Sequence, residues 1–413
     1  MKSTGVPDQT SQKSTRKILI GRLIDGTGTR LTENILMTVK EGRILEMHPF
    51  HVGETTPKDL WLDLSAFTVL PPLFDCHVHL ALSGSIDPAR KVNPLHLAYE
   101  SIFPDITRHI QANFRHGVLG VRDGGDPLGH VLRYKQEGSV PKKNMVQIGA
   151  TGCAWYREGR YGKLIGRPVP AGKEAAVWID RKTGDGVDHI KLIQSGLNSL
   201  SQFGRETPPQ FDEEDIEKIY AIARNRGISL MIHANGEMPV AVATAGGCDS
   251  IEHGYFMGDE NLRKIADVGI TWVPTAIPMK ALAEHSPKGR TEHEVAQRTL
   301  EHQLGQLSKA REYGIAVALG SDAGSPGVHH GKAVSQELAL FVAAGYTPEE
   351  AIRCGSLNAA QLMGADIPGY LGSGTPATFI VLKGKRSNIL QQLKKIEMMV
   401  VSGEIVEVGS GLS

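Results

Sequence analysis

The sequence lacks the features that mark nucleic-acid-binding, membrane-spanning and exported proteins. It has no excess charge of either sign, because 45 lysines and arginines balance 45 aspartates and glutamates. No basic stripe indicates nucleic acid or an anionic membrane surface as a partner, and no apolar run reaches the length of a membrane span. The polar start, MKSTGVPDQTSQKSTRK, has no apolar signal-peptide core. We therefore expect a cytoplasmic protein that acts on a small molecule, and the sequence leaves a homo-oligomer open.

Cysteine is scarce and shows no pairing pattern. There are four cysteines, and none lies in a CxxC pair: Cys76, Cys153, Cys248 and Cys354. No spacing fits a zinc ribbon, so we expect free thiols in a reducing compartment.

Both ends of the chain have strand-like patterns. Segments such as KILIGRLIDG, NILMTVKEGRILEMH and ATFIVLKGK alternate apolar and polar residues between glycines. We predict that residues 17–70 and 371–413 fold together as a small β-sandwich domain, preceded by a flexible arm at residues 1–16. The middle of the chain would then be an insertion between the two halves of that domain.

The middle, residues 71–370, alternates short apolar strands with helical patterns. Eight segments are strand candidates: CHVHLA, GVLGVRD, MVQIGAT, DHIKLIQ, SLMIHAN, SIEHG, ITWVPTA and AVALGSD. Alternating strand and helix units predict an α/β fold with a parallel sheet. Eight such units over roughly 250 residues or more favour a closed (β/α)8 TIM-type barrel. A doubly wound open sheet is the alternative.

Helical patterns fill the stretches between these strands. Two long candidates are DEEDIEKIYAIARNRG and EHEVAQRTLEHQLGQLSKAREYG. The stretch Thr347-Pro348-Glu349-Glu350 has a threonine cap, a proline in the first turn and a capping-box glutamate. We expect one helix to run from there through AIRCGSLNAAQLMG to the final glycine.

Two histidines stand two residues apart in the first strand of the middle region, LFDCHVHL. Residues i and i+2 of a strand face the same side, so His77 and His79 can converge on one point. A metal ion is a common reason to gather histidines. Two histidines satisfied by hydrogen bonds explain the pair equally well.

Lys191 lies between apolar neighbours in the fourth strand, DHIKLIQ. Burial favours the neutral amine, and a neutral amine can react with carbon dioxide to give a carbamate. The two oxygens of a carbamate can bridge two cations. The alternative is a lysine whose amine extends to solvent.

Later strand ends carry further ionisable residues. His233 ends the fifth strand, SLMIHAN, and His253 ends the sixth, SIEHG. One helix and one turn separate them, so both histidines should lie at the same end of adjacent parallel strands. Asp322 ends the eighth strand at its carboxyl end, where barrel active sites form.

Together the strand ends offer a set of metal ligands: His77, His79, Lys191, His233, His253 and Asp322. Nitrogen and oxygen ligands suit zinc or another first-row divalent ion. Such a metal can lower the pKa of bound water to about 7 and so supply hydroxide at neutral pH. Asp322 is then the candidate general base, and later the acid that protonates the leaving group.

This pattern resembles the amidohydrolase superfamily over nearly the whole chain. The resemblance includes LIDGTG, LPPLFDCHVHL, GVLGVRDGG, VDHIKLIQSG, LMIHANG, DSIEHG, LGSDAG and HHGKAVSQEL. Within the superfamily the chain is most similar to the prolidase-like and imidazolonepropionase-like branch of metal-dependent hydrolases. IKLIQSG is similar to enzymes whose lysine is carbamylated, so the resemblance implies a carbon dioxide-derived carbamate on Lys191 that bridges two divalent metals, with zinc expected.

The resemblance also implies a role for each remaining ligand. His77, His79 and Asp322 would bind the more buried metal, and His233 and His253 the more exposed one. A bridging hydroxide would attack an amide, peptide or cyclic amide carbonyl while Asp322 shuttles the proton. The chain would then be a hydrolase of carbon–nitrogen bonds. Dipeptidases of this branch often continue with glycines and Ser-Pro where this chain has SGLNSLSQFG, which argues against dipeptide recognition.

Two other functions share this fold. A mononuclear-metal deaminase or imidazolone-type ring hydrolase would leave Lys191 unmodified and use a catalytic glutamate, for which Glu237 is the candidate. A non-catalytic relative is the third hypothesis. Such proteins usually lose ligands, whereas all six positions are filled here.

Three residues are candidate substrate contacts. His330, in the loop after the eighth strand, either reaches the substrate or is a surface histidine. Arg122 in VRDGG either binds a carboxylate with two hydrogen bonds or pairs with Asp123 or Asp126. Tyr255 either orients the oxyanion of the scissile carbonyl or only packs.

The segment TGCAWYREGRYGKLIGRPVPAG, after the third strand, is a candidate lid or wall of the site. Three aromatic residues in it favour an apolar group on the substrate: Trp155, Tyr156 and Tyr161. Three basic residues favour an acidic group instead: Arg157, Arg160 and Lys163.

Overall fold

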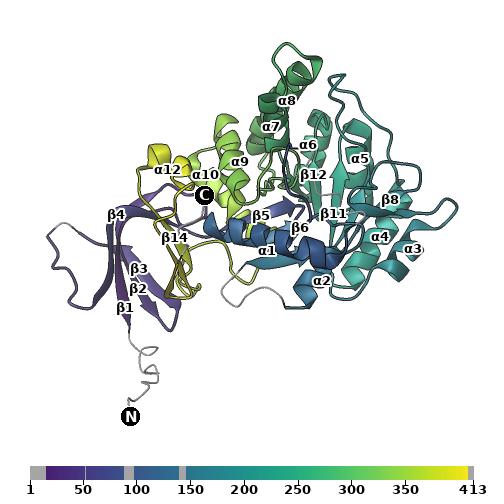
Figure 1. The fold of residues 1–413 in the computed structure, drawn as a ribbon. Coiled ribbons are helices and arrows are strands. Elements are labelled where there is room, and N and C mark those ends of the chain that lie inside the picture. Colours follow the sequence, from purple (N-terminus) through teal and green to yellow (C-terminus); the bar gives the residue numbers. More distant parts are fainter. Residues whose placement is uncertain (1–14, 52, 88–96, 139–145, 408–413) are drawn as a thin grey trace.

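The computed structural model of the chain describes residues 15–51, 53–87, 97–138 and 146–407 (Figure 1). Most of the predicted arm at residues 1–16 lies outside these ranges, and the first strand already begins at Arg16. All four cysteines are free, and three of them are buried, with Cys153 partly exposed. In the described part of the chain, no helix is both long and apolar enough to cross a bilayer.

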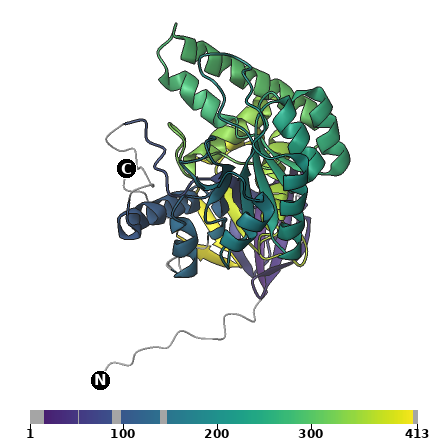
Figure 2. The same cartoon turned by 90° about the vertical axis from the view of Figure 1, so that its right-hand side faces the viewer.

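Strands from both ends of the chain join in one seven-stranded sheet. Its order is β16 (Glu404–Val406), β15 (Met398–Val401), β14 (Phe379–Leu382), β4 (Leu60–Leu70), β1 (Arg16–Leu23), β2 (Thr32–Lys40) and β3 (Arg43–Pro49). Only β1 and β4 pair in parallel within it. The first and last strands lie together in both views (Figures 1 and 2). A cluster of alternating apolar residues, among them Ile18, Ile20, Val69 and Phe379, forms the core of this sheet.

The middle of the chain forms two parallel sheets. One has six strands in the order β13 (Thr271–Val273), β12 (Ser250–His253), β11 (Ser229–Ala234), β10 (His189–Ile193), β8 (Ala154–Arg157) and β9 (Gly166–Val169). The other has three, β5 (Leu73–Val78), β6 (Val118–Asp123) and β7 (Gln147–Ala150). Seven of the eight expected strands are present as β5, β6, β7 and β10 to β13. The short strands β8 and β9 lie in the segment expected to be a lid and were not foreseen.

The eighth expected strand, AVALGSD, forms isolated bridges instead of a continuous ladder. It pairs with β13 at Val317 and with the end of β5 at Ala323. The amide of Asp322 donates to the carbonyl of His77 at 2.7 Å. A side chain at Gly320 would collide with His77 and with β13, so the segment is tightly held between the two sheets. This position brings Asp322 beside the histidines of the first strand.

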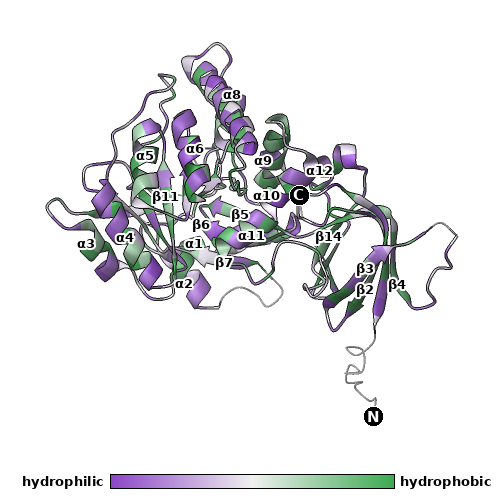
Figure 3. Cartoon of the chain, turned by 180° about the vertical axis from the view of Figure 1, so that it is seen from behind, coloured by the Kyte–Doolittle hydropathy of each residue, from purple (hydrophilic) through white to green (hydrophobic). Residues whose placement is uncertain are grey.

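Helices lie around the parallel strands (Figures 1 and 2). They are α1 (Tyr99–Arg115), α2 (His130–Gln136), α3 (Ala175–Lys182), α4 (Glu213–Asn225), α5 (Glu237–Gly246), α6 (Gly258–Val268), α7 (Ile277–His285), α8 (Thr291–Glu312), α9 (Lys332–Ala343), α10 (Pro348–Gly355), α11 (Leu357–Met363) and α12 (Ile389–Gln392), with a short 3₁₀ turn η3 (Arg386–Asn388) before the last. Both long helix candidates are confirmed, as α4 and α8. Figure 3 shows hydrophilic and hydrophobic residues mixed along α8, and the buried residues of this helix include polar ones, Thr299, Gln303 and Gln306.

The helix expected from Thr347 onward is two helices. α10 ends at Gly355 and α11 begins at Leu357, because Ser356 leaves the helical conformation with φ −122° and ψ −87°. The hydroxyl of Ser356 donates to the carbonyl of Ile352, and the backbone of Gly369 passes close to the Ser356 carbonyl. Tertiary packing therefore interrupts a pattern that looks continuous in the sequence.

The capping box at the start of α10 is confirmed, and it yields a prediction about stability. The hydroxyl of Thr347 accepts from the amide of Glu350, and the Glu350 carboxylate accepts from the amide of Thr347. We expect Thr347→Ala to lower the free energy of unfolding by about 1 kcal/mol, measured by urea denaturation. Thr347→Ser keeps the hydroxyl and should stay close to the wild type. Equal losses in both variants would contradict a capping role.

Candidate metal centre

Three of the predicted ligands form a compact group at the carboxyl ends of the strands. Oδ1 of Asp322 lies 3.3 Å from Nε2 of His79 and 3.7 Å from Nε2 of His77. One nitrogen of each histidine and one oxygen of the aspartate all lie within 4.8 Å of one another, and all three residues are buried. Two imidazoles and a carboxylate at this spacing can hold one divalent ion.

The other two predicted histidine ligands, His233 and His253, lie next to this group. The ring of His253 lies 4.8 Å from that of His77 and 4.5 Å from that of His233, measured between centroids. Nε2 of His233 is 3.2 Å from the carbonyl of Gly196, so Nδ1 is the ring nitrogen left for another partner. The ring of His79 lies 5.4 Å from that of His77, so the four imidazoles are close neighbours.

Lys191 is buried in β10, with 1% of its surface exposed. Its Nζ has no hydrogen-bond partner among the described residues. Burial lowers the pKa of this amine from 10.5 to about 8, against the opposing charge of Glu252. The alternative in which Lys191 extends to solvent is therefore wrong. A buried amine without a partner fits a group that gains oxygens, as a carbamate does.

Burial also favours the neutral form of three of the histidines. It lowers the pKa of His233 to about 4, and those of His77 and His253 well below the usual 6.5. The charge of Lys191 lowers all three further. Metal ions bind the neutral form of imidazole, so these side chains are in the binding form at neutral pH.

Side chains behind two of the histidines fix which nitrogen is free. Nδ1 of His77 lies 2.7 Å from Oε2 of Glu252, and Nδ1 of His253 lies 2.6 Å from the hydroxyl of Thr275. In both cases Nε2 is the ring nitrogen left for a metal ion. A second group that orients a histidine in this way is typical of metal sites.

Three residues of the centre have left-handed backbone conformations that non-glycine residues seldom adopt. The φ angles are 67° at His253, 55° at Asp322 and 43° at Thr275. Such conformations persist where surrounding contacts enforce them, and they gather at functional sites. The strand ends are bent here so that the two ligands and the threonine point inward.

Comparison with known proteins agrees with this geometry. A model of the amidohydrolase family matches residues 68–406. The chain belongs to the amidohydrolase family. It is therefore a hydrolase of carbon–nitrogen bonds, and its family is metal-dependent, in agreement with the group of His77, His79 and Asp322.

Individual relatives of this amidohydrolase are distant. Ochratoxinase from Aspergillus niger is 27% identical over 357 residues, which cover 79% of this chain and 72% of that protein. Imidazolonepropionase from Porphyromonas gingivalis is 29% identical over 208 residues, which cover 48% and 45%. The solved structure of a Xaa-Pro dipeptidase matches 95% of this chain and 100% of its own, with a TM-score of 0.77 at 24% identity. The last likeness concerns the fold alone.

Arg122 is a correction to the substrate contacts expected for this amidohydrolase. Its guanidinium is buried beneath the centre, where Nη2 lies 2.7 Å from Oε1 of Glu252 and 3.0 Å from the hydroxyl of Ser250. Its Nε donates to the carbonyl of Cys76. It therefore neither faces a substrate nor pairs with an aspartate of its own segment. Arg122 contacts Glu252, which in turn contacts His77, so Arg122 supports a candidate metal ligand instead.

Glu252 was missed by the sequence analysis. It lies directly before His253 in SIEHG, on the opposite side of the strand, and is fully buried. A glutamate inside an apolar strand needs a buried partner, and this was the sequence feature that could have identified it.

Tyr255 lines the site but does not present its hydroxyl to it. The hydroxyl donates to the carbonyl of Thr275 at 2.8 Å. The ring borders a cavity next to the ligands. This geometry favours packing, the alternative to orienting an oxyanion.

His330 is buried, so the surface alternative is wrong. Its ring stacks on His109 of α1 at 4.1 Å between centroids, and its Nε2 is 3.1 Å from the carbonyl of Leu82. The residue is absent from the lining of the cavity next to the ligands. Its described contacts are with the protein, and a substrate contact stays a prediction.

A cavity of about 240 Å³ opens beside the centre. Its polar side includes His233, His253 and Asp322, together with Asn235 and Ser325. Its remaining wall is largely apolar, from the loop after β10 and from α7. A substrate in this cavity would contact both the ligands and the apolar wall.

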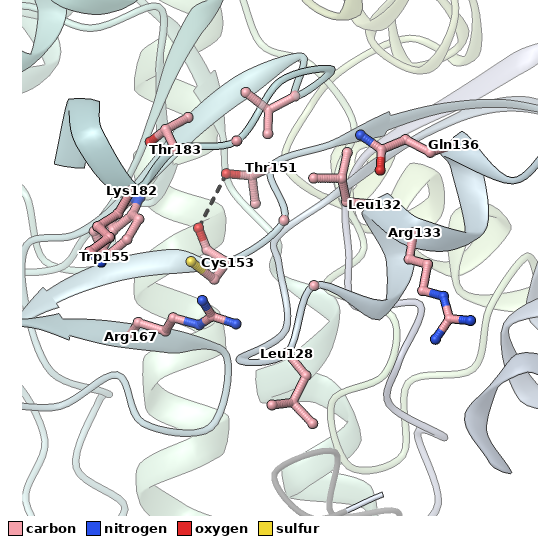
Figure 4. Close-up of a pocket in the computed structure, with 14 residues that line it drawn as sticks. Leu128, Leu132, Arg133, Gln136, Thr151, Cys153, Trp155, Arg167, Lys182 and Thr183 are labelled. Atoms are coloured by element: carbon pink, nitrogen blue, oxygen red, sulfur yellow. Dashed lines mark hydrogen bonds between the residues drawn. The ribbon is translucent and has the colours of Figure 1, made fainter. Parts of the chain in front are cut away.

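The predicted lid is divided between two places. Tyr161 approaches the centre, with its ring 6.0 Å from that of His233, and packs with Tyr156. Trp155 faces the other way, since successive strand residues alternate sides, and lines a separate cavity of about 200 Å³ (Figure 4). Arg157 pairs with Asp215 and Arg160 with backbone carbonyls, so neither is free for an acidic substrate group.

Glu237, the candidate glutamate of a mononuclear enzyme, begins α5 and is exposed. Its carboxylate lies against Gly258 at the start of α6. The residue does not border the cavity beside the centre. This position gives Glu237 no catalytic role.

The contact between Glu252 and His77 predicts a role in metal affinity. Glu252→Gln should weaken zinc binding about 10–100-fold, because the amide orients the imidazole without increasing its basicity. Competition with a chromophoric chelator measures this. The variant also leaves Arg122 buried and unpaired, which destabilises the fold.

The double variant Arg122→Met/Glu252→Gln separates the two effects. It removes both buried charges and should recover stability in urea while zinc binding stays weak. If its zinc affinity equals that of the wild type, the loss in the single variant came from folding.

The stacked pair of His109 and His330 predicts acid sensitivity. Burial lowers the pKa of His109 to about 4, below the ordinary value near 6.5 in the unfolded chain. Between these two pH values the unfolded state binds a proton at His109 and the folded state does not. The free energy of unfolding therefore decreases as pH falls from about 6.5 toward 4. Between pH 7 and 5 the wild type should lose about 2 kcal/mol more than His109→Gln.

Urea unfolding at the two pH values measures this difference. His48→Gln, which removes an exposed imidazole from β3, is the control and should follow the wild type. A His109→Gln variant with the full acid sensitivity of the wild type would contradict the assignment.

Proposed function

We propose that this chain is a binuclear-metal amidohydrolase that cleaves an amide, peptide or cyclic amide bond of a small molecule. The observation that carries the proposal is the unpartnered, buried Nζ of Lys191, together with the four imidazoles and the carboxylate that the fold gathers. Metal-free, this arrangement leaves a buried amine unsatisfied. Two cations and a carbamate would satisfy it.

The proposal includes the architecture. Residues 71–370 would form a closed (β/α)8 barrel, and residues 17–70 with 371–413 a small β-sandwich domain. The bridges of the eighth segment to β13 and β5 support closure on one side. On the other side the amide of Asp188 donates to the carbonyl of Ala150, linking the start of β10 to β7.

The residues present fit two metal ions. His77, His79 and Asp322 would hold the more buried ion, His233 and His253 the other, and a carbamate on Lys191 would bridge them. Histidine and oxygen donors suit zinc. When bound, two such ions supply Lewis acidity to a carbonyl and acidity to a water molecule.

Asp322 is positioned to move the proton. Burial raises its pKa, but a hydrogen bond from His79, the electrostatic influence of His77 and His79, and a hydrogen bond from Ser325 outweigh this, and the net pKa is lowered. The carboxylate is therefore ionised at neutral pH. It can accept a proton from water at Oδ1 or Oδ2 and then donate it to the leaving nitrogen.

Loss of Lys191 tests the proposal. Lys191→Ala should retain less metal than wild-type protein prepared with zinc and bicarbonate, and should lose at least about 100-fold in kcat/KM on an amide substrate. With ¹³C-labelled bicarbonate, the wild type should show a carbamate resonance that the variant lacks. Lys163→Ala, at an exposed lysine of the loop near Tyr161, is the matched control.

Three outcomes distinguish the hypotheses. Wild-type protein without bound divalent metal, together with full turnover by Lys191→Ala, would contradict the proposal. One bound metal with ammonia released from aminated heterocycles would favour the mononuclear deaminase. Inactivity with no metal bound under any loading condition would favour a non-catalytic relative.

A further inference from the structure

The wall of the cavity beside the metal ligands determines what kind of substrate fits. Large apolar side chains make up most of that wall: Leu197, Leu200, Pro278, Met279, Leu282 and Pro326. Among the described residues that line it, none is a lysine or arginine, and Asp322 is the one carboxylate. An anionic group would find no cationic side chain in this wall, whereas an apolar group would find contacts on several sides.

The apolar wall is incompletely covered by the protein itself. Leu197 is 60% exposed, and Leu200 and Leu282 are half-buried. An exposed leucine is ordinary by itself, but these leucines surround one cavity that also contains metal ligands. An apolar group in the cavity would remove them from water together, which is favourable in proportion to the area covered.

The size of the cavity suits a ring or a branched chain. Its volume is about 240 Å³, whereas a dry cavity of roughly 150 Å³ can hold benzene. The opposite side of the cavity carries the ligands, so a carbonyl attached to the apolar group would lie toward them.

The wall is also firmly held. The carboxylate of Glu337 in α9 accepts from the amides of Ala276 and Ile277, at 2.8 and 2.7 Å, at the start of α7. Glu337 is fully buried. The helix that supplies Met279 and Leu282 is thus fixed before a substrate arrives, which lowers the ordering cost of binding.

Cationic side chains line a different cavity. Arg133, Arg167 and Lys182 surround the cavity that also contains Cys153 and Trp155 (Figure 4). Near the metal ligands, Arg122 is buried behind Glu252 and cannot reach the wall. Cationic side chains therefore line another cavity of this protein, whereas the residues that line the cavity beside the metal centre include no lysine or arginine.

We propose that this cavity takes an uncharged apolar group, an aromatic ring or a branched aliphatic chain, attached to the scissile carbon–nitrogen bond. This rests on the proposed function and defines its substrate class. A substrate with a free carboxylate at that position, as on one end of a dipeptide, would be rejected.

A matched set of 4-nitroanilides tests the acyl side: acetyl, 4-methylpentanoyl, benzoyl and succinyl. Amides of acetic acid with benzylamine, 3-methylbutylamine and β-alanine test the amine side. On either the acyl side or the amine side, kcat/KM of zinc-loaded protein should be about tenfold or more higher for the apolar substrates than for the acetyl anilide or the anionic substrate of the same set. Equal rates, or preference for a carboxylate on both sides, would overturn the proposal.

A charge placed in the wall gives a second test. Leu282→Lys should lower the apolar-to-anionic preference by at least about tenfold, while Leu282→Met should retain it. Val268→Lys adds the same charge at an exposed position of α6, in a groove formed with Thr271 and Asn358 away from the metal ligands, and should not change the preference. A change of equal size in Val268→Lys would contradict the proposal.

A binding measurement tests the apolar site independently of hydrolysis. Benzamide should bind at least about tenfold more tightly than acetamide or succinamate in ligand-observed NMR, and Leu282→Lys should remove the difference. If benzamide shows this preference but no amide is hydrolysed, the proposed function fails and the apolar site stands. If amides are hydrolysed without preference on either side and benzamide shows none, the apolar site fails and the proposed function stands.

Discussion

The structure depends on the burial of ionisable side chains at one end of its parallel strands. Desolvation opposes charge on Lys191 and on the histidines, and it opposes the charge on Asp322 as well. A core packed with apolar residues would avoid this penalty entirely. The fold retains these groups, and a cation held between the histidines and Asp322 would compensate the buried carboxylate. Family membership and the grouping of His77, His79 and Asp322 agree on this point.

A second layer of residues makes that arrangement specific. Glu252 lies between His77 and Arg122, so a charge behind the ligand is itself neutralised within the fold. Asp75 has a similar position, because its carboxylate accepts from the amide and the hydroxyl of Ser321 next to Asp322. Burial raises the pKa of Asp75 to about 7. The first strand and the segment of Asp322 are therefore joined by polar contacts as well as by backbone bridges.

The convergence of the four histidines and Asp322 could be predicted from sequence because it depends on local rules. Alternation along a strand places His77 and His79 on one side, and repeated strand and helix units place later strand ends together. The supporting contacts could not be predicted this way. The partners of Arg122, the stacking of His330 on His109 and the interruption at Ser356 all depend on residues distant in the chain. The short strands β8 and β9 were missed because each has only four residues and lies in a segment interpreted as a lid or wall.

The corner after β13 connects the metal centre to the substrate wall. Thr275 touches His253 through its hydroxyl and accepts from Tyr255 at its carbonyl, and the two amides that follow are held by Glu337. These contacts stabilise a backbone conformation, φ 43°, that a β-branched residue disfavours. The same turn leads directly into α7, whose Met279 and Leu282 form the apolar wall. A substitution in α7 that shifts this turn would therefore move His253, whereas one confined to the side-chain tips would change the wall alone. The wall side chains can therefore be substituted without a change in the turn that holds His253.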